Sequence, residues 1–183
     1  MTGIICAMEV ELEKIRAMMD PVEGEFEYSS IKYYLGKISG KGVVCAVCGV
    51  GKVFAAMCAQ TMILKFHPDE IINVGVAGSL TSELDIADLV VARKLVQHDM
   101  DVTALEFITK KFQKQLLTEE FGAIACEMEG AAIAQVCYVN KMPFCVLRAI
   151  SDSADEKSHM DYPEFTKIAA QNSAEIIQKY MAM

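Results

Sequence analysis

The chain has 183 residues, of which 53% are hydrophobic and 23% charged, and its formal net charge is −8 at pH 7. This length suits a single domain with a sizeable core, and the composition is ordinary for a globular protein. The acidic balance, with no basic run to offset it, argues against nucleic acid or an anionic membrane surface as the main partner. No apolar stretch approaches membrane-spanning length, and residues 1–7 lack the basic region of a signal peptide, so we expect a cytoplasmic protein.

The first half of the chain alternates apolar runs with segments of helical spacing. Residues 2–7 are typical of a buried strand, and residues 8–19 place apolar side chains at helical intervals. Glu9, Glu11 and Glu13 crowd the start of this helix, where acids commonly compensate the helix dipole, and we expect that role for two of them. The next predicted elements are strands within 26–38 and 42–48, a helix over 53–66 and a buried strand over 69–74.

Glycine-rich segments follow two of these strands, at residues 49–52 and 75–79. The first has neither the spacing of a phosphate-binding loop nor that of a dinucleotide motif, so it indicates only a tight turn or a close approach of the backbone. Cys45 and Cys48 form a C-x-x-C pair, but residues three apart on a strand face opposite sides, and no second pair lies at zinc spacing. We interpret the seven cysteines as mostly buried thiols of a reducing compartment.

The second half continues the alternation of strands and helices. The predicted elements are a strand at 89–91, a polar loop at 97–103, a helix over 109–120, a buried strand at 121–125, a helix beyond 129, a strand at 143–147 and a final helix over 162–181. Strands that alternate with helices predict an α/β domain with helices on both sides of the sheet. There is no internal repeat.

Carboxylates and small residues recur where the predicted strands end. Glu127 and Glu129 lie between a strand and an apolar helix, and although a single glutamate could simply anchor the helix N-terminus, the pair favours a site. Glu11 and Asp152 follow two other strands. Hydrolysis of a glycosidic bond needs one carboxylic acid to protonate the leaving group and one carboxylate to activate water. If the strand ends converge, the sequence provides both.

Segments 3–11, 71–78, 98–104, 127–134 and 148–152, taken together and in order, closely resemble the bacterial 5′-methylthioadenosine/S-adenosylhomocysteine nucleosidases of the purine nucleoside phosphorylase-like superfamily. The resemblance covers nearly the whole chain. It implies a three-layer α/β/α sandwich with a central mixed sheet, a homodimer, an adenine nucleoside as substrate, and no metal or cofactor. The implied reaction releases adenine and the 5-thioribose from methylthioadenosine and S-adenosylhomocysteine.

The resemblance also implies roles for individual residues. Glu11 matches the residue that activates the attacking water, Asp152 the acid that protonates N7 of adenine, and Glu129 the residue that binds the ribose hydroxyls. The other implied substrate-binding residues are Met8, Val50, Ala77, Gly78, Phe107, Ile108, Glu127, Met128, Arg148, Ser151, Tyr162 and, lent to the neighbouring subunit's pocket, Val102 and Leu105.

The chain departs from the family pattern at several positions. Leu105 replaces a usual aromatic residue, Val76 a frequent serine and Cys6 a frequent glycine. Family members also carry several dozen more residues between 105 and 106, including a strand, so we expect that these two residues are not neighbours in the working protein.

Three other functions remain open at this stage. A nucleoside phosphorylase of the same superfamily would need cationic donors for phosphate, and only Lys52 lies near the glycine turn. A hydrolase of futalosine-type nucleosides would differ only in its preference for the 5′-substituent. A purine-binding homologue without activity is the third possibility, because the missing segment could disable catalysis.

Overall fold

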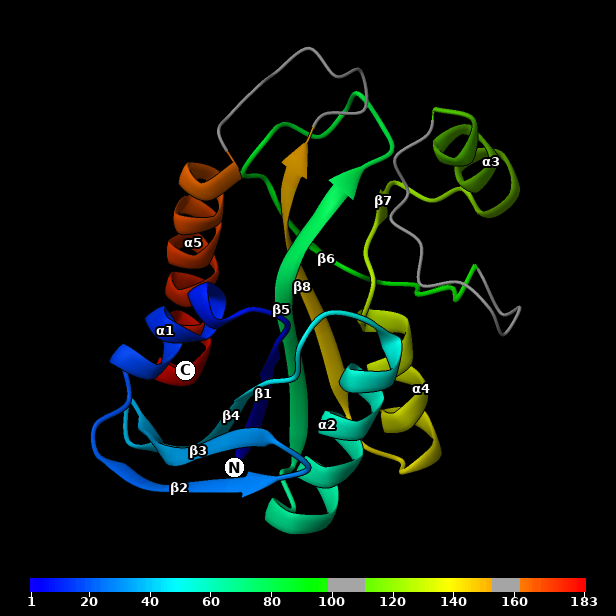
Figure 1. The fold of residues 1–183 in the computed structure, drawn as a ribbon. Helices are drawn as coiled ribbons and strands as arrows, with labels where there is room; N and C mark the ends of the chain where they lie inside the picture. Colours follow the sequence, from blue (N-terminus) through cyan, green and yellow to red (C-terminus); the bar gives the residue numbers. More distant parts are fainter. Residues whose placement is uncertain (99–110, 153–161) are drawn as a thin grey trace.

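The computed structural model of the chain describes residues 1–98, 111–152 and 162–183, shown as coloured ribbon in Figure 1. Within them lie β1 (Thr2–Cys6), α1 (Glu9–Ala17), β2 (Val22–Tyr28), β3 (Ile31–Ile38), β4 (Lys41–Val47), α2 (Lys52–Phe66), β5 (Glu70–Ser79), β6 (Leu89–Val91), α3 (Lys111–Phe121), β7 (Ala125–Cys126), α4 (Gly130–Val139), β8 (Phe144–Asp152) and α5 (Tyr162–Ala182). None of the described helices has the length and apolarity that a membrane crossing requires.

The strands form one mixed sheet in the order β2-β3-β4-β1-β5-β8-β6, and β7 pairs with β5. The central strands β4, β1, β5 and β8 are parallel, whereas β2, β3, β6 and β7 pair in antiparallel fashion. Cys6 is in register with Val74, and Gly75 with Arg148. The carboxyl ends of β1, β5 and β8 are therefore neighbours, at the edge where α/β sheets bind ligands.

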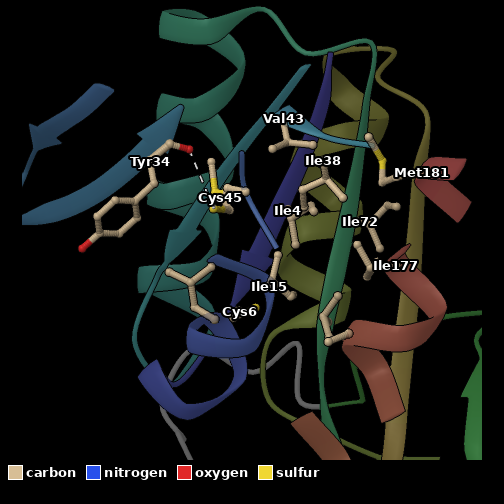
Figure 2. Packing of buried hydrophobic residues seen from close by; sticks show 14 residues of the cluster. Ile4, Cys6, Ile15, Tyr34, Ile38, Val43, Cys45, Ile72, Ile177 and Met181 are labelled. Atoms are coloured by element: carbon tan, nitrogen blue, oxygen red, sulfur yellow. Dashed lines mark hydrogen bonds between the residues drawn. The ribbon is translucent and has the colours of Figure 1, made fainter. Parts of the chain in front are cut away.

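Helices cover both faces of the sheet: α1 and α5 lie on one side, and α2 and α4 on the other (Figure 1). Ile4 packs with Ile177 of α5 in one buried cluster (Figure 2), while Ile5 packs with Met62 of α2 and Ile133 of α4 in another. Neighbouring residues of β1 thus enter opposite cores, as expected for a strand that is covered on both faces. The predicted three-layer arrangement around a mixed sheet is confirmed.

Cys45 and Cys48 lie in these two different clusters, on opposite faces of the sheet. Both are free thiols, and burial raises the pKa of Cys45 to about 12. A thiol that stays protonated is a poor nucleophile and metal ligand, so the structural interpretation of this pair holds.

Several element boundaries differ from the predictions. Residues 75–79 continue β5 instead of forming a turn, and β8 runs through Arg148 to Asp152 instead of ending at residue 147. These two segments pair with each other, so tertiary ladder bonds override the local turn tendency of glycine. Of the predicted buried strand at 121–125, only Ala125 is in a strand, since Phe121 completes α3, and the segment is partly exposed.

Candidate active site

A cavity of about 760 Å³ lies at the carboxyl ends of the central strands. It is lined by every predicted site residue whose side chain the structure describes: Met8, Glu11, Val50, Ala77, Gly78, Glu127, Met128, Glu129, Arg148, Ser151 and Asp152. Val102, Leu105, Phe107 and Ile108 fall outside the described residues, as does the side chain of Tyr162, the first residue of α5.

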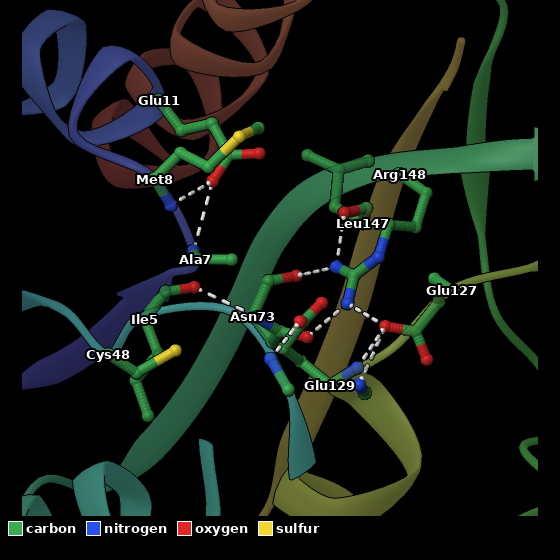
Figure 3. Close-up of polar contacts among 12 residues, drawn as sticks. Ile5, Ala7, Met8, Glu11, Cys48, Asn73, Glu127, Glu129, Leu147 and Arg148 are labelled. Carbon is green, nitrogen blue, oxygen red and sulfur yellow. Dashed lines mark hydrogen bonds and ion pairs between the residues drawn. The ribbon is translucent and has the colours of Figure 1, made fainter. Parts of the chain in front are cut away.

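Glu11 is held at the start of α1, where its side chain turns back toward β1. Its Oε2 atom accepts hydrogen bonds of 2.9 Å from the backbone N–H groups of Ala7 and Met8 (Figure 3). Burial raises the pKa of Glu11 to about 7, although these bonds and the positive charge of Arg148 act in the opposite direction. Glu11 is therefore a carboxylate that exchanges its proton near neutral pH, as a general base requires.

Gly75 lies between Glu11 and Arg148. A methyl group on Gly75 would lie 3.5 Å from Oε1 of Glu11 and 3.4 Å from Nη1 of Arg148. The missing side chain therefore leaves a small open space that both groups face, next to the carboxylate oxygen that the backbone bonds do not use.

Arg148 is the centre of a buried polar network (Figure 3) and is only 3% exposed. Its Nη1 donates to the carbonyl oxygens of Asn73 (3.2 Å) and Leu147 (3.0 Å), and its Nη2 donates to Oδ1 of Asn73 and to Oε2 of Glu127 at 2.5 Å. Asn73 in turn donates to the carbonyl of Ile5. The network ties β1, β5 and β8 together beneath the cavity.

Asn73 is a residue that the sequence analysis missed. It is a fully buried amide within the apolar strand β5. The sequence feature that could have indicated its role is a polar residue inside an apolar strand, because a buried polar group needs hydrogen-bonding partners.

Glu127 and Glu129 lie two residues apart but have different contacts. Oε2 of Glu127 accepts hydrogen bonds from the N–H groups of Glu129 (2.9 Å) and Gly130 (2.7 Å) at the start of α4. Burial alone would raise the pKa of Glu127, but Arg148 and these N–H groups outweigh it and hold the pKa below the usual value. Glu127 thus serves as the helix anchor and the partner of Arg148.

Glu129 has a different partner from Glu127. Its Oε1 accepts a 2.6 Å hydrogen bond from the N–H of Gly51, which has a φ of +104° that favours glycine. Burial raises the pKa of Glu129. The glycine-rich segment at 49–52 therefore brings its backbone to a carboxylate of the cavity.

Asp152 ends β8 with both of its carboxylate oxygens in contact. Ser151 Oγ donates to Oδ1 at 2.7 Å, and Lys114 Nζ of α3 lies 3.2 Å from Oδ2. A methyl group on Gly78 would approach Oδ1 to 2.9 Å, closer than a carbon atom tolerates, so any side chain there would displace the carboxylate of Asp152. Lys114 was not predicted, because a lysine in an amphipathic helix is ordinarily a surface residue.

Comparison with known proteins now identifies the family. The family model described as the phosphorylase superfamily matches residues 2–114 and 102–182. The chain is 31% identical to the 5′-methylthioadenosine/S-adenosylhomocysteine nucleosidase of Oceanobacillus iheyensis, over 96% of both chains. The chain belongs to this nucleosidase family.

Other members of the nucleosidase family show its range. The aminodeoxyfutalosine nucleosidase of Helicobacter pylori is 32% identical over 96% of both chains. A crystal structure of a Helicobacter pylori nucleosidase variant with 5′-methylthioadenosine in its active site is 32% identical, with a TM-score of 0.88 over 98% of this chain and 96% of that one. The chain is thus a nucleosidase-type nucleoside hydrolase, and the predicted family and enzyme class are confirmed.

The nucleosidase alignments are longer than the chain itself. The Oceanobacillus iheyensis alignment has 220 positions against a chain of 183 residues, so 220 less 183 leaves at least 37 positions without a counterpart here. The two matches to the family model overlap at residues 102–114, the region of the predicted break between Leu105 and Glu106. The break itself lies outside the described residues, and its position stays a prediction.

The buried hydrogen-bond network around Arg148 leads to a prediction about the stability of this nucleosidase. Arg148→Met leaves Glu127 buried without a cationic partner, so we expect the free energy of unfolding to fall by about 3–5 kcal/mol. Urea denaturation at pH 7 measures this change. The control is Lys32→Met, which removes the partner of Glu25 in an ion pair that is about half exposed, and little effect is expected there. Equal effects of the two substitutions would contradict the assignment.

Proposed function

We propose that the chain hydrolyses the N-glycosidic bond of 5′-methylthioadenosine and S-adenosylhomocysteine, and releases adenine and the 5-thioribose. The observation that carries the proposal is the pair of carboxylates, Glu11 of α1 and Asp152 of β8, which reach one cavity from different elements. Cleavage with water requires one acid and one base on the two sides of the scissile bond, and the pair supplies both.

We assign the attacking water to the open space at Gly75. There the water would lie between Oε1 of Glu11 and the guanidinium of Arg148. Glu11 takes a proton from the water as its oxygen attacks the ribose carbon, and its pKa of about 7 suits this exchange. Val76 offers no hydroxyl group there, so the water depends on Glu11 and Arg148.

On the side of the leaving group, Asp152 protonates N7 of the purine. Ser151 holds Oδ1 of Asp152, and Gly78 leaves room for the carboxylate. The oxygen of Glu129 that does not contact Gly51 accepts hydrogen bonds from the ribose hydroxyls. Phe107 and Ile108 stay the predicted contacts of the purine ring.

The alternatives are weighed by the same contacts. A phosphorylase needs cations free to bind phosphate, but Arg148 already binds Asn73 and Glu127, which favours water as the nucleophile. A futalosine-type substrate agrees equally well with the family, because relatives of both specificities are about equally similar to the chain. A cytoplasmic location, like action without a cofactor, stays a prediction.

One assay separates these functions. The protein is incubated with methylthioadenosine, S-adenosylhomocysteine, aminodeoxyfutalosine, adenosine and inosine, with and without phosphate, and the free base is measured. We expect adenine from the first two substrates without phosphate. Release of the base that depends on phosphate would establish a phosphorylase. Preferential hydrolysis of aminodeoxyfutalosine would establish a futalosine-type hydrolase. Binding of adenine without release of base from any nucleoside would establish an inactive homologue.

We also propose that two copies of the chain form a homodimer through α2. Val53, Phe54, Met57 and Leu64 of this helix are between 41% and 64% exposed, a large apolar surface for a helix facing water. Val50, which lines the cavity, is itself 46% exposed just before the helix. A second copy docked on α2 would therefore reach the rim of the cavity. Val102 and Leu105, the predicted contacts with the neighbouring pocket, lie outside the described residues.

A charge on this helix should separate the two copies. We expect wild-type protein to sediment at twice 20.1 kDa at micromolar concentration, and Met57→Glu to sediment as a monomer with a raised KM. Val22→Glu, on the edge strand β2 where the valine is 52% exposed, is the control and should stay dimeric. A fully active wild-type monomer would contradict the proposal.

A further inference from the structure

Lys114 is a nearly buried cation directed at the carboxylate of Asp152. Its side chain is 14% exposed, and its ammonium lies 3.2 Å from Oδ2. Among the described residues this ammonium has no other hydrogen-bond acceptor. Burying most of a lysine side chain is unfavourable unless its charge is paired. The position of Lys114 on α3 therefore pairs its ammonium with the carboxylate of Asp152.

The pair meets a requirement of the reaction that a carboxylate alone does not meet. At neutral pH a carboxyl group in water has given up its proton, whereas an ammonium group still carries one. As the C–N bond breaks, the purine receives the bonding electron pair and becomes far more basic than a carboxylate. Proton donation is most efficient when the acid retains its proton at the working pH.

We propose that Lys114 and Asp152 act together as the acid, and that Lys114 supplies the proton that Asp152 passes to the purine; this rests on the proposed function. An N–H bond of the ammonium breaks as an O–H bond forms on Oδ2 of Asp152. That O–H bond then breaks as the N7–H bond forms, while the electron pair of the C–N bond moves onto the purine.

Protons balance over the full cycle. Lys114 is left as a neutral amine and regains a proton from solvent. Glu11 meanwhile releases to solvent the proton that it took from the attacking water. Lys114 therefore acts through Asp152 and positions the transferable proton without touching the substrate.

The test uses two substitutions with different chemistry. Lys114→Arg keeps a cation beside Asp152 but cannot give up a proton, and Lys114→Met removes both charge and proton. We expect both variants to lower kcat for methylthioadenosine about 100-fold or more, with KM changed little. Gln115→Met, at the next and exposed position of α3, is the control and should keep the wild-type rate.

A second substrate distinguishes proton supply from structural damage. A 4-nitrophenyl 5-methylthioriboside releases a nitrophenolate, which needs no proton, so both Lys114 variants should hydrolyse it at near the wild-type rate. Wild-type activity of Lys114→Arg on methylthioadenosine would overturn the inference, because charge alone would then suffice. Equal losses on both substrates would also overturn it. Wild-type protein that releases no base from any nucleoside overturns the proposed function, and this inference with it.

Discussion

Asp152→Asn is expected to lower kcat for methylthioadenosine by about two to four orders of magnitude, because the amide cannot transfer a proton to the purine. The amide is nearly the same size as the carboxyl group; its oxygen can accept from Lys114 Nζ while its NH2 group donates to Ser151 Oγ, so substrate binding should survive. Steady-state kinetics for turnover and calorimetric titration of adenine for binding check the two halves of the prediction.

Asp20→Asn is the matched control, since this aspartate is exposed and lies before β2, outside the cavity lining. It should leave kcat unchanged. Near-wild-type turnover of Asp152→Asn would show that this aspartate is not the acid, whereas a loss of adenine binding would point to a collapsed pocket instead of a missing proton.

Glu11→Gln should abolish hydrolysis and yet leave the protein more stable at pH 8. The amide cannot take a proton from water, but its oxygen can still accept the N–H groups of Ala7 and Met8. The pKa of Glu11 is raised from 4.5 to about 7 in the folded protein, so the folded state binds this proton more tightly than the unfolded state does. The contribution of Glu11 to the free energy of unfolding is therefore largest at low pH and falls as pH rises from 4.5 through 7. At pH 8 the neutral amide should therefore stabilise the fold by up to about 3 kcal/mol.

The same shifted pKa determines the acidic side of the pH profile. Glu11 is active as a base only when ionised, so kcat/KM of the wild-type protein should rise with pH through about 7. The stability prediction for Glu11→Gln is measured by thermal unfolding at pH 4 and pH 8. The difference in stability between wild type and Glu11→Gln should be smaller at pH 4 than at pH 8. A kcat/KM already constant from pH 5 upward would contradict the assignment of Glu11.

The local pattern of the chain was enough to predict the class of fold. Apolar runs such as residues 2–7 and 69–74 separate helices of regular spacing, and neighbouring side chains such as Ile4 and Ile5 can both be apolar only if the sheet is covered on both faces. Motif order along the chain predicted the family and the cavity residues, because each motif follows a strand and the carboxyl ends of parallel strands share one edge.

Tertiary structure alone decided which partner each polar group has. The local pattern did not separate Glu127 from Glu129, although the family resemblance assigned the ribose to Glu129, and only the tertiary contacts with Arg148 and with Gly51 distinguish the two carboxylates. Lys114 contacts Asp152 although the two residues are 38 positions apart in the sequence. The spacing of apolar residues within a helix or strand does not predict such a contact.

The strand boundaries have the same physical origin. Residues 75–79 and the end of β8 resemble turns locally, but each supplies the ladder partner of the other. Hydrogen bonds between distant segments outweigh the weak local preferences of small residues. By itself the sequence determined that helices cover both faces of a sheet and that Glu11, Glu129 and Asp152 belong to one cavity; the strand boundaries and the pairing of charges were decided only when the strands came together.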